Sequence, residues 1–192
     1  MTAMNKRISE IGVVPVIKLN NPECDAIPLA KALCEGGVPV AEVTFRAPRA
    51  EMAIRAMREA CPNMLVGAGT VLTKEQVDLS IEAGAQFIVL PGFDAELVTY
   101  CQEKNIPIYP GCTTATDYHT ALKYNLSVLK FFPAEQSGGL AKIKAMAAPY
   151  VNMKFMPTGG VNAKNLTSYL DFPKIIACGG SWMVPGDLIN AG

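Results

Sequence analysis

The chain has 192 residues, of which 50% are hydrophobic and 18% charged, so it has enough apolar material for the core of one domain over residues 1–192. Its 17 basic and 17 acidic residues cancel to a formal charge of zero, which gives no support to a nucleic-acid or membrane surface. No apolar run approaches the roughly 18 residues of a membrane-spanning helix, and we expect a cytoplasmic protein.

The cysteine and histidine content bounds the chemistry further. Six cysteines are scattered through apolar segments without a CxxC pair. We interpret them as small buried hydrophobic residues of a reducing compartment, because a chain of this size and composition does not need a disulfide framework. His119 is the only histidine, which argues against a metal site built from imidazole ligands.

One structural unit recurs along the chain after a short helix predicted for residues 1–11. The unit is a β-rich run, a turn, an amphipathic helix, and a glycine or asparagine that ends the helix. The predicted strands start 20 to 26 residues apart and cover residues 13–19, 38–46, 64–70, 86–92, 106–112, 128–134, 152–159 and 174–181. The predicted helices lie near residues 22–36, 49–60, 73–83, 94–104, 114–124, 139–149 and 162–170.

The alternation of strand and helix predicts right-handed crossovers and a parallel α/β sheet. Eight units favour a closed (β/α)8 TIM barrel over an open doubly wound sheet. A Rossmann fold would carry GxGxxG after the first strand, where residues 18–23 read KLNNPE instead. A closed barrel also needs a helix after the eighth strand, and only residues 182–190 follow it. We therefore expect that the final helix is missing here and that the expressed chain extends past Gly192 by about one helix, because a bare groove between the first and last strands would expose apolar surface.

The stretch VLKFFPAE at residues 128–135 places a lysine inside an apolar strand. If Phe131 points outward to the helices, the two-residue period of a strand turns Lys130 and Phe132 the other way. The three other lysines of predicted strands are weaker candidates for chemistry. Lys154 and Lys174 lie near amino-terminal strand ends, away from the expected active face, and Lys18 lacks polar neighbours.

In the second predicted strand, the same alternation places Glu42, Thr44 and Arg46 on one face. Alternate strands of a barrel share layers, so Glu42 and Lys130 can face each other across the core. One interpretation is a buried ion pair that serves only the fold, although such pairs are poor stabilisers. We favour a catalytic pair, because burial makes a lysine amine release its proton more easily, and a neutral amine can attack a ketone.

Paired glycines follow the last two predicted strands, at residues 159–160 and 179–180. Backbone N–H groups without a neighbouring Cβ can approach an anion, and a helix that starts there favours negative charge. Phosphate is commonly bound after the seventh and eighth strands of such barrels. We therefore expect a phosphate site here, with residues 182–190 remaining at that end of the barrel.

Seven motifs resemble one family over essentially the whole chain: VVPVI at 13–17, AEVT at 41–44, GAGTVL at 67–72, LPG at 90–92, KFFPAE at 130–135, PTGG at 157–160 and GGSW at 179–182. The family is that of the 2-keto-3-deoxy-6-phosphogluconate (KDPG) aldolases, also called 4-hydroxy-2-oxoglutarate (KHG) aldolases, which are class I barrel enzymes. The KFFPAE and GGSW motifs are specific to it. This chain departs from the family in stopping about one helix early.

The resemblance implies that Lys130 is the Schiff-base lysine and Glu42 the general acid/base. It implies that the other site residues hold the substrate: Arg46 and Thr70 at the carboxylate, Pro91, Phe132 and Thr158 along the pocket, and Gly159, Gly160, Gly180 and Ser181 at the phosphate. It further implies cleavage of KDPG to pyruvate and glyceraldehyde 3-phosphate in the Entner–Doudoroff pathway, and of KHG to pyruvate and glyoxylate. Neither a metal nor an organic cofactor is expected, and the implied assembly is a homotrimer.

Two alternatives stay open at this point. The first is another phosphate-binding barrel enzyme, such as an isomerase or synthase, which would not form an imine. The second is an inactive barrel that only binds a metabolite.

Overall fold

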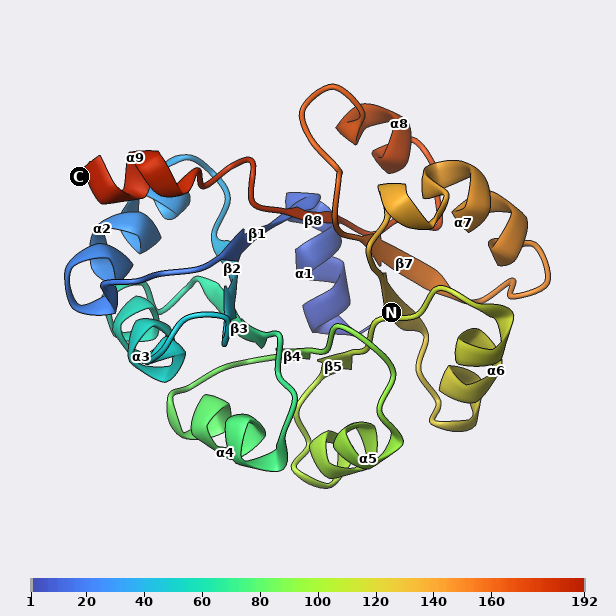
Figure 1. Ribbon diagram of the computed structural model, residues 1–192, viewed down its shortest axis with the longest axis horizontal. Helices are drawn as coiled ribbons and strands as arrows, with labels where there is room; N and C mark the ends of the chain where they lie inside the picture. Colours follow the sequence, from blue (N-terminus) through green and yellow to red (C-terminus); the bar gives the residue numbers. More distant parts are fainter. Residues whose placement is uncertain (1, 192) are drawn as a thin grey trace.

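The computed structural model describes residues 2–191, and the side chains of residues 2–189. Strands and helices alternate along the chain, and the helices that follow the leading one form an outer ring around the strands (Figure 1). The strands are β1 Val13–Ile17, β2 Val40–Thr44, β3 Leu65–Gly69, β4 Ile88–Val89, β5 Ile108–Tyr109, β6 Val128–Phe131, β7 Lys154–Pro157 and β8 Cys178–Gly180. The helices are α1 Ala3–Ile11, α2 Pro22–Glu35, α3 Ala50–Ala60, α4 Lys74–Glu82, α5 Ala95–Glu103, α6 Ala115–Lys123, α7 Gly139–Ala147, α8 Leu166–Leu170 and α9 Gly186–Ala191, with a 3-10 turn η1 at Glu135–Ser137.

The pairings within both sheets are parallel, as the alternation predicted. A curled six-stranded sheet has the order β5-β4-β3-β2-β1-β8, and β6 pairs with β7 in a second sheet. Isolated bridges join the two sheets: Gly111 with Lys130 on one side, and Phe155 with Ile175 and Thr158 with Gly179 on the other.

The predicted eight-stranded ladder is therefore seen only in part. The strand β5 is two residues long, where seven were expected. Pro107 and Pro110 flank it, and a proline has no N–H to donate to a sheet. Between β5 and β6 the pairing is therefore limited to the single bridge of Gly111 with Lys130. Lys130 N donates to Pro110 O over 3.0 Å, and Cys112 N donates to Lys130 O over 2.8 Å.

The two-residue period sorts side chains between the inside of the curled sheet and the helix layer. Val43 on β2, with Leu129 and Phe131 on β6, packs among buried side chains of the helices. The alternate positions Glu42 and Lys130 turn inward and meet each other. The predicted orientation of both strands is confirmed.

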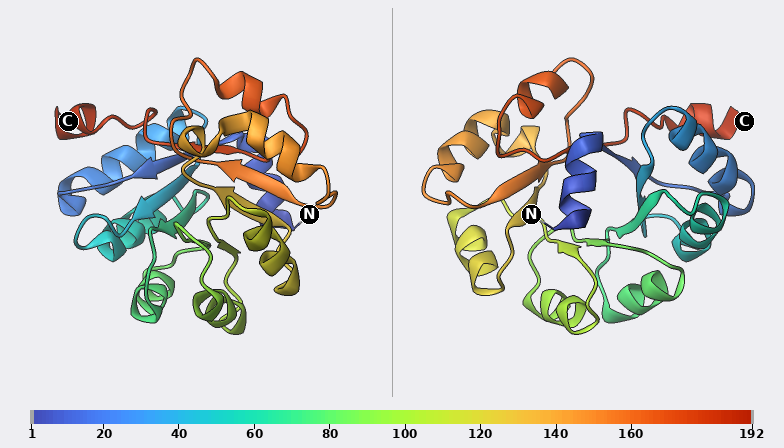
Figure 2. Two further views of the ribbon diagram at one scale, coloured as in Figure 1. Left: turned by 45° about the vertical axis from the view of Figure 1, so that its right-hand side comes forward. Right: turned by 180° about the vertical axis from the view of Figure 1, so that it is seen from behind.

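The leading helix α1 lies across the amino-terminal end of the strands (Figure 2). Its Ile8 is fully buried in the inner apolar cluster. The Tyr109 hydroxyl at the end of β5 donates to Asn5 Oδ1 over 2.6 Å, and Arg7 donates to the carbonyl of Asn63 in the loop before β3. The helix therefore closes this end of the fold.

The last two helices differ from the prediction. Helix α8 starts at Leu166 rather than near 162, because Asn162 accepts from Lys164 N and Asn165 accepts from Asn162 N, at 2.9 and 2.8 Å, and such local bonds compete with a helix. We expected residues 182–190 to remain at the end of the fold that carries the glycine pairs, but α9 lies beside α2 (Figure 1), and Ile189 packs on the apolar cluster that includes Leu33. The expectation about sequence past Gly192 lies outside the described residues.

Candidate active site

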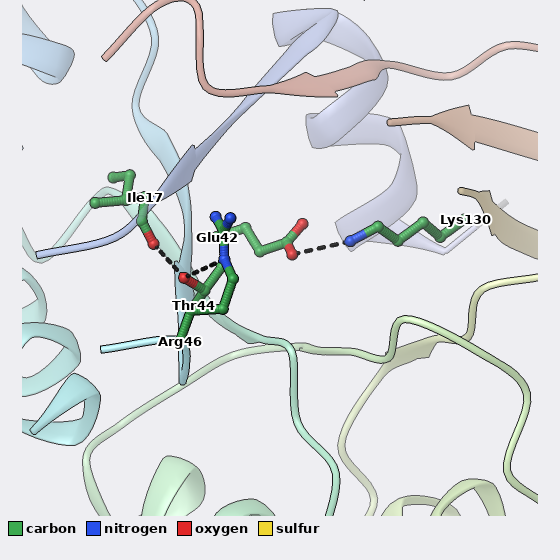
Figure 3. A network of polar contacts seen from close by, with 5 residues as sticks. All are labelled: Ile17, Glu42, Thr44, Arg46 and Lys130. Carbon is green, nitrogen blue, oxygen red and sulfur yellow. Dashed lines mark hydrogen bonds and ion pairs between the residues drawn. The ribbon is translucent and has the colours of Figure 1, made fainter. Parts of the chain in front are cut away.

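A buried lysine and a buried glutamate meet at the centre of the fold. The Lys130 Nζ on β6 donates to Glu42 Oε1 on β2 over 3.1 Å (Figure 3), and the two residues are only 5% and 3% exposed. Removing two opposite charges from water costs free energy, and the attraction between them often does not offset that cost. A buried ion pair therefore suggests a role other than stabilising the fold. An amine here can act as a nucleophile once it gives up its proton, and the carboxylate beside it can accept one.

The ion pair rests on an apolar floor. Ile8, Val14, Phe87 and Met156 are among the side chains around a void of about 10 Å³ beneath it. A void of this size holds at most about one water molecule. The floor keeps bulk water from the amine on the side of α1, so the pair is open to small molecules only from the opposite side.

That opposite side is a cleft of about 530 Å³. It is lined by every site residue expected from the sequence: Glu42, Arg46, Thr70, Pro91, Lys130, Phe132, Thr158, Gly159, Gly160, Gly180 and Ser181. The cleft lies at the carboxyl ends of the strands, where a barrel fold places its functional residues. The volume suits a small metabolite.

Near the amine, the cleft is lined by two cationic side chains, Arg46 and Lys130, and by the aromatic ring of Phe132. Arg46, two residues beyond Thr44 at the end of β2, donates through Nε to the Thr44 hydroxyl over 3.2 Å. The Lys130 Nζ lies 5.2 Å from the centre of the Phe132 ring, within range of a cation–π contact. The cleft therefore combines a guanidinium suited to a carboxylate with an amine suited to a carbonyl.

Thr70 follows β3 in an uncommon backbone conformation. Its φ angle is 54°, in the left-handed region that a β-branched residue rarely occupies. A conformation of this kind costs on the order of 1–3 kcal/mol and is often found at functional sites. It places the Thr70 side chain in the lining of the cleft.

The glycine pairs lie at one end of the cleft, but without adjacent helix starts. Gly159 and Gly160 have φ angles of 98° and 81°, which most other residues cannot adopt without strain. The expected helix dipoles are absent at this end, because α8 and α9 start several residues later and are short. Any anion held here would depend on backbone N–H groups and on the Ser181 hydroxyl.

Glu135, the last residue of KFFPAE, ties the loop after β6 to the loop after β7. Its backbone N donates to Gly159 O over 3.0 Å, and its carboxylate accepts a hydrogen bond from the buried Tyr169 of α8. Burial, together with the bond to Glu135, raises the pKa of Tyr169, so the phenol remains a donor. The contact braces the backbone at the glycine end of the cleft.

Neither of the buried cysteines near the site competes with Lys130 as a nucleophile. Burial raises the pKa of the Cys178 thiol on β8 to about 12, and burial also raises that of Cys112. A thiol attacks as its thiolate, so both are inert at neutral pH. Lys130 is therefore the candidate nucleophile of this region.

Comparison with known proteins places these features in a family. A sequence model of the KDPG and KHG aldolase family matches residues 4–192. A 2-dehydro-3-deoxy-phosphogluconate aldolase of Treponema pallidum is 47% identical over 100% of this chain and 91% of its own length. The chain belongs to the KDPG and KHG aldolase family. It is therefore an aldolase, a carbon–carbon lyase, and the family expected from the sequence motifs is confirmed.

Solved structures of KDPG aldolases share the fold. The Legionella pneumophila enzyme, with pyruvate captured as a covalent carbinolamine intermediate, matches with a TM-score of 0.93 and 39% identity, covering 97% of this chain and 91% of that one. The Zymomonas mobilis ZM4 enzyme with 3-phosphoglycerate matches with a TM-score of 0.90 and 39% identity, over the same shares of the two chains.

Four further residues of this aldolase line the cleft although the sequence did not single them out: Val16, Val161, Asn162 and Trp182. The indole of Trp182 lies directly on Gly180, where a Cβ would come within 1.9 Å of the ring. The sequence signal that could have identified Trp182 as a cleft residue is its place in the GGSW motif. The motif alone does not predict that the ring folds back over Gly180.

A second hollow, of about 460 Å³, lies between α2 and residues 183–189 and is mainly apolar. Its lining contains no lysine, so it offers no side-chain amine that could form an imine. Within residues 2–191, no cluster of three His, Cys, Asp or Glu side chains is placed to hold a metal ion. In the same part of the chain, no helix has the length and apolar character to cross a membrane.

Proposed function

We propose that this aldolase cleaves KDPG to pyruvate and glyceraldehyde 3-phosphate through an imine on Lys130. The observation that carries the proposal is the Lys130 amine, buried 3.1 Å from Glu42 at the base of a cleft that Arg46 also lines. Family membership supports the reaction, and the described side chains supply a nucleophile, a proton acceptor and a cation for the substrate's carboxylate.

In the first stage, the neutral Lys130 amine attacks the C2 carbonyl carbon and forms a carbinolamine. The former carbonyl oxygen then leaves as water, and the protonated imine between Nζ and C2 becomes the electron sink.

In the second stage, Glu42 takes the proton of the C4 hydroxyl, directly or through a water molecule. The C3–C4 bond breaks, its electron pair passes into the imine to give an enamine, and C4 leaves as the aldehyde carbon of glyceraldehyde 3-phosphate. Protonation of the enamine at C3 and addition of water to the imine then release pyruvate and free Lys130.

The remaining site residues hold the two ends of the substrate in this proposal. Arg46 and Thr70 bind the C1 carboxylate, with the guanidinium in a charge-assisted contact. The phosphate lies among the backbone N–H groups of the two glycine pairs and the Ser181 hydroxyl. Pro91, Phe132 and Thr158 form the walls between the two ends.

We infer that KHG is also a substrate and gives pyruvate and glyoxylate. The family description includes both activities. Lys130, Glu42 and Arg46 act on the keto-acid portion that the two substrates share, so the same steps apply.

Three further properties belong to the proposal. The two sheets form one closed (β/α)8 barrel, supported by the isolated bridges on both sides of the β6–β7 pair. The enzyme is a cytoplasmic protein of the Entner–Doudoroff pathway, which agrees with six unpaired cysteines among the described residues. It assembles as a homotrimer, for which the sequence resemblance is the support and sedimentation analysis the test.

Trapping with borohydride tests the central claim. Reduction in the presence of pyruvate should add a three-carbon unit to the peptide that contains Lys130, and Lys130→Met should abolish the adduct. The variant Lys18→Met, at an exposed lysine of the same barrel end, is the matched control and should trap normally. An adduct on Lys18 would move the imine to another lysine, and the absence of any adduct would overturn the imine mechanism.

A further inference from the structure

Thr44 lies buried beneath the cleft, at the carboxyl end of β2, and does not line the cleft itself. Its hydroxyl donates to the carbonyl of Ile17 on β1 over 2.7 Å and accepts from Arg46 Nε over 3.2 Å (Figure 3). These two contacts connect the end of β1, through one hydroxyl, to the guanidinium at the mouth of the cleft.

The direction of these bonds follows from what each group can do. A threonine hydroxyl has one proton and two lone pairs, whereas a guanidinium only donates. The Ile17 carbonyl only accepts, so the hydroxyl proton points to Ile17 and a lone pair faces Arg46 Nε. The hydroxyl has no second arrangement that satisfies both neighbours, and it therefore holds the plane of the guanidinium.

The contact also decides which edge of Arg46 remains for a ligand. An arginine can bind a carboxylate through Nε with one Nη, or through its two Nη groups. The Arg46 Nε–H is already bonded to the Thr44 hydroxyl. Among the residues that the structure describes, no protein group accepts a hydrogen bond from Nη1 or Nη2 of Arg46. The edge formed by the two Nη groups is thus left for the incoming anion.

We propose that Thr44 is a positioning residue for the substrate's carboxylate: it orients Arg46 so that the two Nη groups face the cleft. The inference rests on the proposed role of Arg46 and adds that Thr44 acts only through it. The alternative is that Thr44 merely links β1 to β2 by satisfying the Ile17 carbonyl, in which case its loss weakens the fold and leaves ligand recognition unchanged.

Two variants separate these roles. Thr44→Val keeps the shape of the side chain and removes the hydroxyl, whereas Thr44→Ser keeps the hydroxyl. The half-saturating pyruvate concentration for borohydride trapping, and KM for KDPG, should rise roughly 3- to 10-fold in Thr44→Val, the effect of one lost hydrogen bond. Both values should stay near wild type in Thr44→Ser, and kcat should change less than twofold in either variant.

Two controls make the test specific. Hydroxyacetone has the ketone of pyruvate but no carboxylate, so its trapping should not differ between wild type and Thr44→Val. In an Arg46→Met background, Thr44→Val should cause no further loss of pyruvate affinity. Wild-type enzyme that fails to trap pyruvate would contradict the proposed function rather than this inference.

The opposite results overturn the inference. An unchanged half-saturating pyruvate concentration in a folded Thr44→Val enzyme, or an equal loss in the Arg46→Met background, would show that Thr44 does not act through Arg46. Thermal melting confirms folding in each case. If the valine variant does not fold, Thr44→Cys replaces it, because a thiol is a weaker donor and acceptor and should give an intermediate rise.

Discussion

The carboxylate of Glu42 occupies space that is open only because residue 69 is a glycine. A Cβ at Gly69 would lie 2.2 Å from Glu42 Oε1 and 2.5 Å from its Cγ. The two residues belong to neighbouring strands, β2 and β3. The glycine of the GAGTVL motif thus leaves the space in which the Glu42 carboxylate meets Lys130.

Gly69→Ala should therefore slow aldol cleavage without removing any functional group. The added methyl pushes the Glu42 carboxylate away from its place beside Lys130, and we expect aldol cleavage to fall by roughly tenfold or more, as for loss of an aligned proton-transfer group. Steady-state cleavage of KDPG measures the effect. Gly186→Ala is the control, because a Cβ there meets open space; equal activity of the two variants would show that the carboxylate need not be held.

Glu42→Gln should separate imine formation from bond cleavage. The amide oxygen can still accept from Lys130, so the protein should fold, and pyruvate should still be trapped, if slowly. We expect KDPG cleavage to drop roughly 10²-fold or more, because the amide cannot take the C4 hydroxyl proton. Turnover near the wild-type rate would mean that another group is the base.

Ser181→Ala should discriminate between the two substrates. The variant loses the proposed contact between the Ser181 hydroxyl and the phosphate, which KHG does not carry. KM for KDPG should therefore rise several-fold while KM for KHG stays the same. Side-by-side kinetics on the two substrates provide the measurement. Equal losses on both would assign Ser181 a purely structural role.

The cysteines should differ sharply in reactivity. Cys24 is exposed, whereas burial raises the pKa of Cys101 and Cys178 to about 12. At pH 8, dithionitrobenzoate should modify Cys24 in the native protein and reach Cys101 and Cys178 only after denaturation. Rapid native modification of the buried pair would contradict the packing described here.

The same shifts predict lower stability in alkali. An unfolded thiol titrates near pH 8.5, so above that pH the unfolded chain loses protons that folded Cys101 and Cys178 keep until about pH 12. The free energy of unfolding should fall as the pH rises through this window, and burial of Tyr109 and Tyr118 acts in the same direction. Urea titrations at pH 7.5 and 10 measure the change; Cys101→Val should reduce it, and a rise in stability would contradict it.

The alternation of side chains between the two faces of β2 and β6 was enough to predict that Glu42 and Lys130 face one another. Both strands are apolar and regular, and a register shift of one residue would place the two charged side chains among the helices. The order of strands and helices was equally predictable, because α1, α2, α4, α5 and α6 each end within two residues of a glycine or asparagine.

Other features depend on contacts that no local pattern encodes. The Ile17 carbonyl that orients Thr44 belongs to a different strand, so the bond appears only once β1 and β2 are aligned. Asn162 and Asn165 read as ordinary helix positions until their side chains are seen bonded to the backbone of that turn. The packing of α9 beside α2 brings together segments about 150 residues apart in the sequence, and nothing in residues 186–191 specifies that partner.

The position of α1 has a consequence for the order in which products leave. With Ile8 and the bond between Tyr109 and Asn5 closing the amino-terminal end of the strands, the cleft opens at the carboxyl end alone among the described residues. Both fragments must depart through the mouth by which the substrate arrived, and the fragment attached to Lys130 lies deepest. Glyceraldehyde 3-phosphate should therefore be released first and pyruvate last, which makes pyruvate the competitive product inhibitor and glyceraldehyde 3-phosphate a noncompetitive one.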